Sequence, residues 1–238
     1  MPRLLVAFLF LLFAAPAAAQ TFNGQEQAEI RAIVRDYLVR NPDVLQEALE
    51  ALQERSNAER WQRAKSDPRD FSIGPADAPV TIVEFFDYRC PYCMASLEWV
   101  VDVVRTRRDV RFVFKELPLD IHGEPAIEAS RASIAAMPQG RYFQFHQALL
   151  NYSGDLTSER IDQLARQSGI DVARMRRAMA SEAITDILQD NRGLAVDLGV
   201  NGTPAFFING EMVAGYNRPL LEEKLREATR NAQRGRRS

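Results

Sequence analysis

Two cysteines three positions apart, Cys90 and Cys93, are the only ones in the chain. A disulfide between them would close so small a loop that it would remove little chain entropy, so stability is a poor reason for the pair. Zinc needs four ligands and no second cysteine pair is present, and we interpret His122 and His146 as ordinary polar residues. A copper(I) site is an alternative interpretation of the pair, because two thiolates at a shared interface can hold this ion. The spacing favours a redox-active dithiol.

The cysteine pair lies between a predicted buried strand and a predicted helix. Residues 80–86 form a nearly continuous apolar and β-branched run, and helical spacing follows the motif at Leu97, Val100, Val101 and Val104. The unpaired N–H groups and the dipole at a helix N-terminus favour negative charge, so we expect Cys90 to be the nucleophilic thiolate. Cys93, one turn further, is expected to resolve the mixed disulfide. Pro91 suits the first helical turn.

The elements after the motif complete a recognisable order. A strand, a helical block, two short strands and a last helix are predicted at 110–117, 124–198, 205–208, 212–214 and 219–230. Asn209-Gly210 between the short strands is a strong hairpin signal. The order βαβ, helical block, ββα predicts an α/β chain with a thioredoxin fold over residues 80–230 and a central helical insertion.

The first residues have the pattern of a secretory signal. Arg3 precedes an apolar run over residues 4–15, and the small residues 17–19 form an A-x-A site, so we predict a signal peptide over 1–19 that is cleaved after Ala19. A membrane anchor is the alternative, but the run is shorter than the ~20 residues that span a bilayer.

Between the signal and the predicted domain lies a helical extension, residues 20–66. Asn41-Pro42 divides two helical patterns whose apolar positions are Ile30, Val34, Leu38, Leu45, Leu49 and Leu52. Residues 67–79 contain three prolines and are predicted to be a linker. The apolar stripe must be buried, either on its own domain or, as we favour, by self-association.

Composition and charge exclude some classes of protein. The chain is 46% hydrophobic and 26% charged, with a formal net charge of −2, which does not point to nucleic acid. The last residues, 231–238, contain Arg234, Arg236 and Arg237 and are interpreted as a basic, solvated tail.

Three motifs together resemble a known family, the DsbA-like periplasmic disulfide oxidoreductases, and within it the ScsC-type proteins associated with copper tolerance. They are EFFDYRCPYC at 84–93, GVNGTPAFFI at 199–208 and YLVRNPDVL at 37–45. The resemblance implies a periplasmic protein without a cofactor, protein substrates that contain cysteines, and a membrane redox partner. It also implies a homotrimer formed through residues 25–65.

The resemblance also assigns residues around the cysteines. It implies that Pro204 is a cis-proline facing the pair, that the backbone of Thr203 accepts a substrate strand, and that Pro91 and Tyr92 contribute to substrate binding. Tyr92 stands where the best-known DsbA has a histidine, so the thiolate should rely more on the helix terminus and the protein should be a weaker oxidant.

Glu84 falls where the family keeps a buried acid, which would accept the proton of Cys93. From the residues alone, a carboxylate that faces solvent is the alternative, because the strand allows either face.

The leading hypothesis is therefore a thiol–disulfide oxidoreductase, with oxidase, isomerase and reductase all left open. A copper(I)-binding protein that uses the same thiolates is the alternative from another class. A structural surface protein with a vestigial redox site is the third.

Overall fold

The computed structural model describes residues 22–235, so the predicted signal peptide, 1–19, lies outside the described residues. None of the helices in this described range combines the length and the apolar character needed to span a membrane. The chain divides into two compact units between Gln53 and Glu54.

Two helices make up the extension, as predicted. Helix α1 (Gly24–Arg40) begins with a capping box, in which the Asn23 side chain accepts from the backbone of Glu26 at 3.0 Å and the Glu26 carboxylate accepts from the backbone of Asn23 at 2.8 Å. It ends where the backbone and side-chain N–H groups of Asn41 both donate to a carbonyl one turn earlier. Helix α2 (Pro42–Ser66) then starts at a proline, which needs no N–H partner there.

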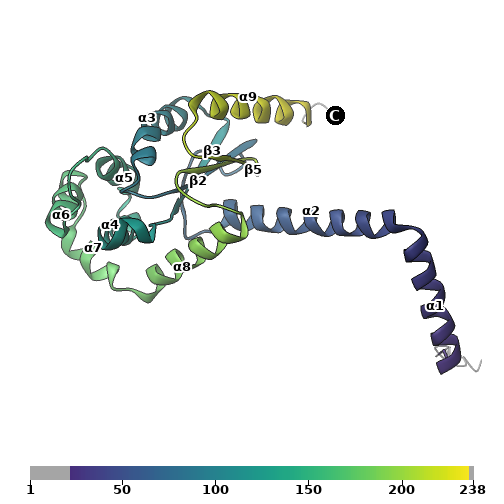
Figure 1. The fold of residues 1–238 in the computed structure, drawn as a ribbon. Helices are drawn as coiled ribbons and strands as arrows, with labels where there is room; N and C mark the ends of the chain where they lie inside the picture. Colours follow the sequence, from purple (N-terminus) through teal and green to yellow (C-terminus); the bar gives the residue numbers. More distant parts are fainter. Residues whose placement is uncertain (1–21, 236–238) are drawn as a thin grey trace, which may run out of the picture. The chain divides into compact units, whose positions relative to one another are not determined.

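The second unit is built on a five-stranded sheet of order β1-β3-β2-β4-β5 (Figure 1). Strands β2 and β3 are parallel and joined by helix α3, while the other neighbours pair antiparallel. The strands are β1 (Phe71–Ile73), β2 (Val80–Phe86), β3 (Val110–Glu116), β4 (Ala205–Ile208) and β5 (Glu211–Ala214). This is the predicted thioredoxin fold.

The predicted helical insertion is present as a series of separate helices. After α3 (Pro91–Thr106), the chain forms α4 (Gly123–Ala136), α5 (Tyr142–Leu150), α6 (Ser158–Gln167), α7 (Val172–Met179) and α8 (Glu182–Asp197). Helix α9 (Arg218–Gly235) follows β5.

Strand β2 is buried on both faces, as its apolar run predicts. Ile82 and Phe86 lie in a core with residues of α3, α4, α5 and α9. Val83 and Phe85 lie in a second core with residues of α8 and the end of α2. Because side chains alternate along a strand, Glu84 shares the face of Ile82 and Phe86.

The prediction that residues 67–79 are a linker is wrong in one respect, because this stretch contains β1. Its residues pair with β3, and Phe71 stacks on Tyr142 with ring centroids 4.3 Å apart. The prolines flank the strand without interrupting it, so they do not prevent the pairing. The extension also ends earlier than the predicted residue 66, because Trp61 and the fully buried Ala64 of α2 pack in the second unit's core.

The hairpin between β4 and β5 is confirmed. Asn209 and Gly210 both have positive φ, 48° and 96°, as a two-residue turn of this kind requires. The predicted tail is corrected, because α9 continues to Gly235; no helix breaker occurs before that glycine, and 236–238 lie outside the described residues.

Candidate active site

Cys90 is the N-cap residue of α3 and Pro91 is the first residue of the helix. The Cys90 carbonyl already accepts from the backbone N–H groups of Cys93 and Met94, each at 3.1 Å, so the helical hydrogen bonds begin at the cysteine itself. No side chain caps this terminus through the N-cap residue, which leaves the first N–H groups directed at the sulfur.

The two thiols differ sharply in environment. Cys90 is 5% exposed and Cys93 is fully buried, so the outer cysteine is less open than we expected of a nucleophile. A hydrogen bond from the Cys93 thiol and backbone N–H groups of the helix lower the pKa of Cys90 to about 5. Burial raises the pKa of Cys93 well above its usual value, and the charges nearby add to this. One sulfur is thus a thiolate at neutral pH while the other holds its proton.

Glu84 lies behind the pair and is 1% exposed, which excludes the solvent-facing alternative. Burial is the main reason that the pKa of Glu84 rises to about 8. Ser96, on α3 one turn after Cys93, places its hydroxyl 3.5 Å from Glu84 Oε1 and donates to the carbonyl of Cys93 at 2.9 Å. The other carboxyl oxygen of Glu84 has no partner in the described residues and is available for a proton.

The Thr203–Pro204 peptide bond is cis, as the resemblance implied. The sulfur of Cys90 lies 3.1 Å from the carbonyl oxygen of Thr203, which accepts a hydrogen bond when the thiol is protonated, so this loop lies directly against the outer sulfur. Pro204 is buried, whereas Tyr92 is 67% exposed beside the motif. The residues predicted for substrate binding therefore lie around Cys90.

Sequence reasoning missed a buried polar cluster next to the motif. Glu116 accepts hydrogen bonds from the hydroxyls of Tyr88, at 3.1 Å, and Tyr142, at 2.8 Å. His146 lies 3.2 Å from the Tyr88 hydroxyl, and burial lowers its pKa to about 3, so the ring is neutral. Strand and helix periodicity predicts burial of such residues but not which polar groups meet. The cluster ties the loop before Cys90 to the insertion.

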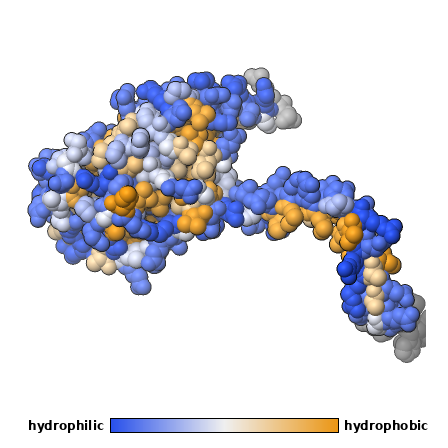
Figure 2. All heavy atoms as spheres, in the orientation of Figure 1, coloured by the Kyte–Doolittle hydropathy of each residue, from blue (hydrophilic) through white to orange (hydrophobic). Residues whose placement is uncertain are grey.

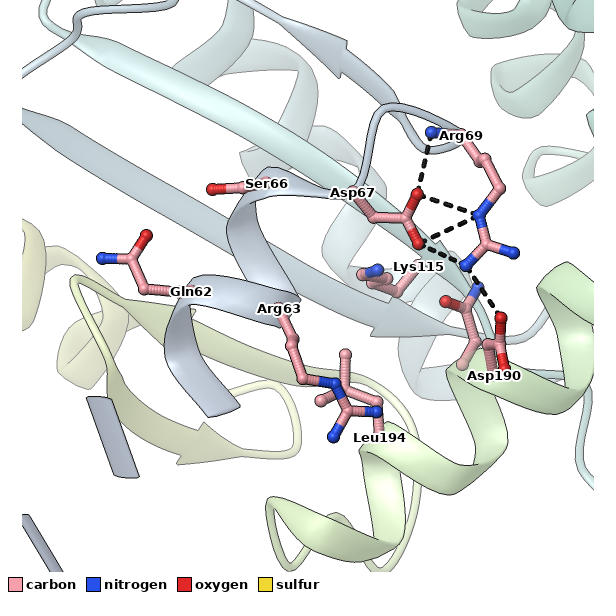
Figure 3. Close-up of a pocket in the computed structure, with 9 residues that line it drawn as sticks. Gln62, Arg63, Ser66, Asp67, Arg69, Lys115, Asp190 and Leu194 are labelled. Atoms are coloured by element: carbon pink, nitrogen blue, oxygen red, sulfur yellow. Dashed lines mark hydrogen bonds and ion pairs between the residues drawn. The ribbon is translucent and has the colours of Figure 1, made fainter. Parts of the chain in front are cut away.

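Away from the cysteines, a cavity of about 440 Å³ lies between the end of α2, β3 and α8 (Figure 3). Its cations are paired with carboxylates: Arg69 with Asp67 and Asp190, and Lys115 with Asp70 at 2.5 Å. We interpret this cavity as an ion-paired packing contact, because its charges are already compensated.

A family model described as thioredoxin matches residues 66–228 of the chain. The chain belongs to the thioredoxin family. A second model, described as the copper resistance protein ScsC N-terminal domain, matches residues 26–59. This thioredoxin-family chain therefore carries an ScsC-type N-terminal segment, and the resemblance seen in the sequence is confirmed.

Solved structures agree with this membership. A thioredoxin-like oxidoreductase from Silicibacter pomeroyi superposes on the chain with a TM-score of 0.67 and 34% identity, covering 71% of this chain and 97% of that one. A Proteus mirabilis ScsC variant with a deleted linker gives 0.67 and 28%, covering 91% and 100%. The chain is thus similar to a solved thioredoxin-like oxidoreductase and to a solved ScsC.

Longer curated proteins also contain a related segment. The Na(+)/H(+) antiporter NhaA 1 of Salinispora arenicola is 35% identical over 163 residues, which are 67% of this chain and 25% of the antiporter. The thioredoxin-family chain therefore spans about a quarter of the length of the curated relatives that it matches first.

The raised pKa of Glu84 predicts a pH dependence of stability. Between the ordinary value of 4.5 and about 8, the folded chain holds a proton that the unfolded chain releases. Rising pH therefore favours unfolding, by up to about 1.4 kcal/mol per pH unit from this group. We expect Glu84→Gln to flatten the decline in the free energy of unfolding of the reduced protein, measured with urea between about pH 5 and pH 8.

Glu116 offers a matched comparison, because burial raises its pKa to about 8 as well. Glu116→Gln should flatten the same decline, and in the double variant the stability should level off or rise with pH, because the lowered pKa of Cys90 acts in the opposite direction. A Glu84→Gln protein whose stability falls with pH as steeply as the wild type would contradict the raised pKa.

Proposed function

We propose that this chain exchanges disulfides with cysteine-containing proteins through Cys90 as nucleophile and Cys93 as resolving thiol. The observation that carries the proposal is the difference between the two sulfurs: the pKa of Cys90 falls to about 5 while that of Cys93 is raised. A thiolate that is stable at neutral pH attacks disulfides. The neighbouring thiol, Cys93, is protonated and therefore unreactive until the mixed disulfide has formed.

The exchange balances without a cofactor. The Cys90 thiolate attacks a substrate disulfide, forms a mixed disulfide and releases one substrate thiolate. Cys93 then loses its proton and attacks the Cys90 sulfur, which releases the second substrate thiolate and leaves a Cys90–Cys93 disulfide. The substrate is reduced and the dithiol is oxidised; the reverse sequence oxidises a substrate dithiol.

In this scheme Glu84 takes the proton of Cys93 when its carboxyl is ionised, which is a minority of molecules at neutral pH because burial raises the pKa of that carboxyl to about 8. Its buried carboxyl has one oxygen without a partner in the described residues, and its negative charge is one of the causes that raise the pKa of Cys93. Transfer of the proton to Glu84 avoids placing two charges in the same buried space. Ser96 is close enough to hold the carboxyl in place.

The substrate segment that fits this site is an extended peptide. The Thr203 carbonyl lies 3.1 Å from the Cys90 sulfur, so a strand that pairs with the Thr203 backbone brings its own sulfur to the thiolate. Pro91 and the exposed Tyr92 offer apolar contact on the other side of the sulfur.

We further propose that residues 25–65 form a homotrimer. Large apolar side chains are exposed along one side of α1 and α2 (Figure 2), and Ile30, Val34, Leu38, Pro42 and Leu45 line a groove of about 670 Å³. A continuous exposed apolar face of this kind is typical of an interface. The match of residues 26–59 to the ScsC N-terminal model supports the same reading.

The proposal includes the cellular location of the protein and the direction in which it exchanges disulfides. We place the protein in the periplasm with a membrane redox partner, in line with a solved relative that is a periplasmic thioredoxin-like protein from Salmonella enterica. Of the three directions, we propose isomerisation, because an assembly that carries several Cys90–Cys93 pairs can act repeatedly on one bound substrate. Copper(I) binding through the same two thiolates is the alternative from another class, and the experiment below distinguishes it from disulfide exchange.

The test is refolding of a protein with scrambled disulfides by the full-length chain, with insulin reduction as a second substrate. We expect catalysis of both, and equilibration with glutathione then gives the potential that separates isomerase from oxidase. No catalysis of either reaction, together with stoichiometric copper(I) binding by the two thiols, would replace the proposal with the copper alternative.

A further inference from the structure

The loop that carries the cysteines is held by one buried carboxylate. Asp87 is fully buried, and its Oδ1 accepts from the backbone N–H of Arg89 at 2.6 Å. Its Oδ2 accepts from the backbone N–H of Leu119 at 2.7 Å and lies 2.8 Å from Nδ1 of His122. A buried carboxylate is stable as an anion when it receives several such hydrogen bonds.

The backbone of Asp87 contacts both cysteines. Its carbonyl accepts from the N–H of Cys90 at 3.1 Å, which closes the turn between them. Burial is the main influence on the pKa of Cys93, and the backbone N–H of Asp87 is a hydrogen-bond donor to the ionised sulfur that acts in the opposite direction. A change in the position of Asp87 therefore moves the backbone of Cys90 and a hydrogen-bond donor at the Cys93 sulfur.

His122 reaches Asp87 from a separate element. It ends a short 3-10 helix (Asp120–His122) that follows β3, and it immediately precedes α4. Its side chain is 21% exposed, so one edge of the ring faces Asp87 and the ring is partly open to solvent. An ionised carboxylate only accepts hydrogen bonds, which places a proton on Nδ1.

We propose that His122 is a positioning residue, which acts through the buried carboxylate of Asp87 to hold the turn carrying Cys90 in the geometry that stabilises its thiolate. The sequence alone indicates no more than an ordinary polar residue at His122. The inference rests on the proposed function, because disulfide exchange is what the Cys90 thiolate is used for. The reactivity of Cys90 can nevertheless be measured without any exchange reaction.

The test compares His122→Ala with His122→Asn in the full-length reduced protein. The amide nitrogen of asparagine can occupy the place of Nδ1, so it keeps the donor, whereas alanine removes it. Without this donor the turn that carries Cys90 is held less firmly, and we expect the pKa of Cys90 to rise by about one pH unit, which lowers its thiolate fraction at about pH 5 roughly fivefold. We expect His122→Ala to slow alkylation of Cys90 by iodoacetamide at about pH 5 by roughly fivefold, and His122→Asn to restore most of the rate.

Arg107→Ala is the matched control at the opposite end of α3. Arg107 donates to Asp109 at 2.8 Å and to Thr229 at 2.8 Å, so its loss weakens the fold without touching the cysteine loop. Its alkylation profile should match the wild type. An unchanged profile in His122→Ala, equal slowing in the alanine and asparagine variants, or equal slowing in Arg107→Ala would each overturn the proposal. If the wild type does not reduce insulin but the His122 variants still show the expected changes in the alkylation rate of Cys90, the proposed function is wrong and the role of His122 stands.

Discussion

Replacing Cys93 with serine is expected to leave the protein joined covalently to its substrates. Cys90 can still attack a disulfide, but no second thiol remains to release the mixed disulfide. Replacing Cys90 with serine should lower exchange by at least about a thousandfold, as expected when the nucleophile is removed, without trapping substrate. Non-reducing electrophoresis of each full-length variant after incubation with a disulfide-containing protein measures both outcomes.

Cys93→Ala provides the control for this pair. The Cys93 thiol makes the largest contribution to the lowered pKa of Cys90, and a serine hydroxyl can still donate while alanine cannot. The alanine variant should therefore also trap substrate, but more slowly than the serine variant at about pH 6. Equal trapping by Cys90→Ser and Cys93→Ser would contradict the assignment of nucleophile and resolving thiol.

The parts of the fold that follow from local pattern could be predicted from the sequence. The apolar run of β2 predicts a strand buried on both faces, and Asn209-Gly210 predicts a hairpin because both residues must adopt positive φ. The Cys90-to-Cys93 spacing at a helix start predicts that Cys90 is the more acidic thiol, since the donors of the first turn face it, whereas the raised pKa of Cys93 comes mainly from burial.

Features that depend on contacts between distant residues could not be predicted in the same way. The strand alternation allows Glu84 either face, and the choice is made by α3, which brings Ser96 to it. The pairing of β1 with β3 depends on Phe71 meeting aromatic residues far along the chain. The contact between His122 and Asp87 joins residues 35 positions apart, and no spacing rule indicates it.

The end of the extension could not be predicted from the sequence either, and its true position determines which variants can test assembly. The helical pattern continues to Ser66, but Trp61 and Ala64 belong to the core of the second unit. A truncation at Ser66 would remove core side chains and confuse loss of assembly with loss of stability. Substitutions within residues 22–53 leave that core untouched, so they test assembly alone.

We expect Leu38→Asp combined with Leu45→Asp to convert the full-length protein from a trimer to a monomer. Both side chains line the apolar groove, and burial of a leucine contributes roughly 1.5–3 kcal/mol that a charged residue reverses. Sedimentation at micromolar concentration measures the change. Gln46→Asp is the control, because it adds one negative charge at an exposed position outside the groove lining and should leave the assembly intact.

The monomeric variant should keep insulin reduction and lose refolding of scrambled substrates. A substrate held by one Cys90 meets the other sites of the same assembly at a high effective concentration, so repeated exchange without release is favoured. We expect isomerase activity to fall roughly tenfold or more on dissociation, while reduction, which needs one dithiol, changes little. If the wild type already sediments as a monomer, the groove is covered in another way and the trimer proposal is wrong. If the double variant is monomeric but refolds scrambled protein as fast as the Gln46→Asp control, then assembly is not what makes isomerisation possible.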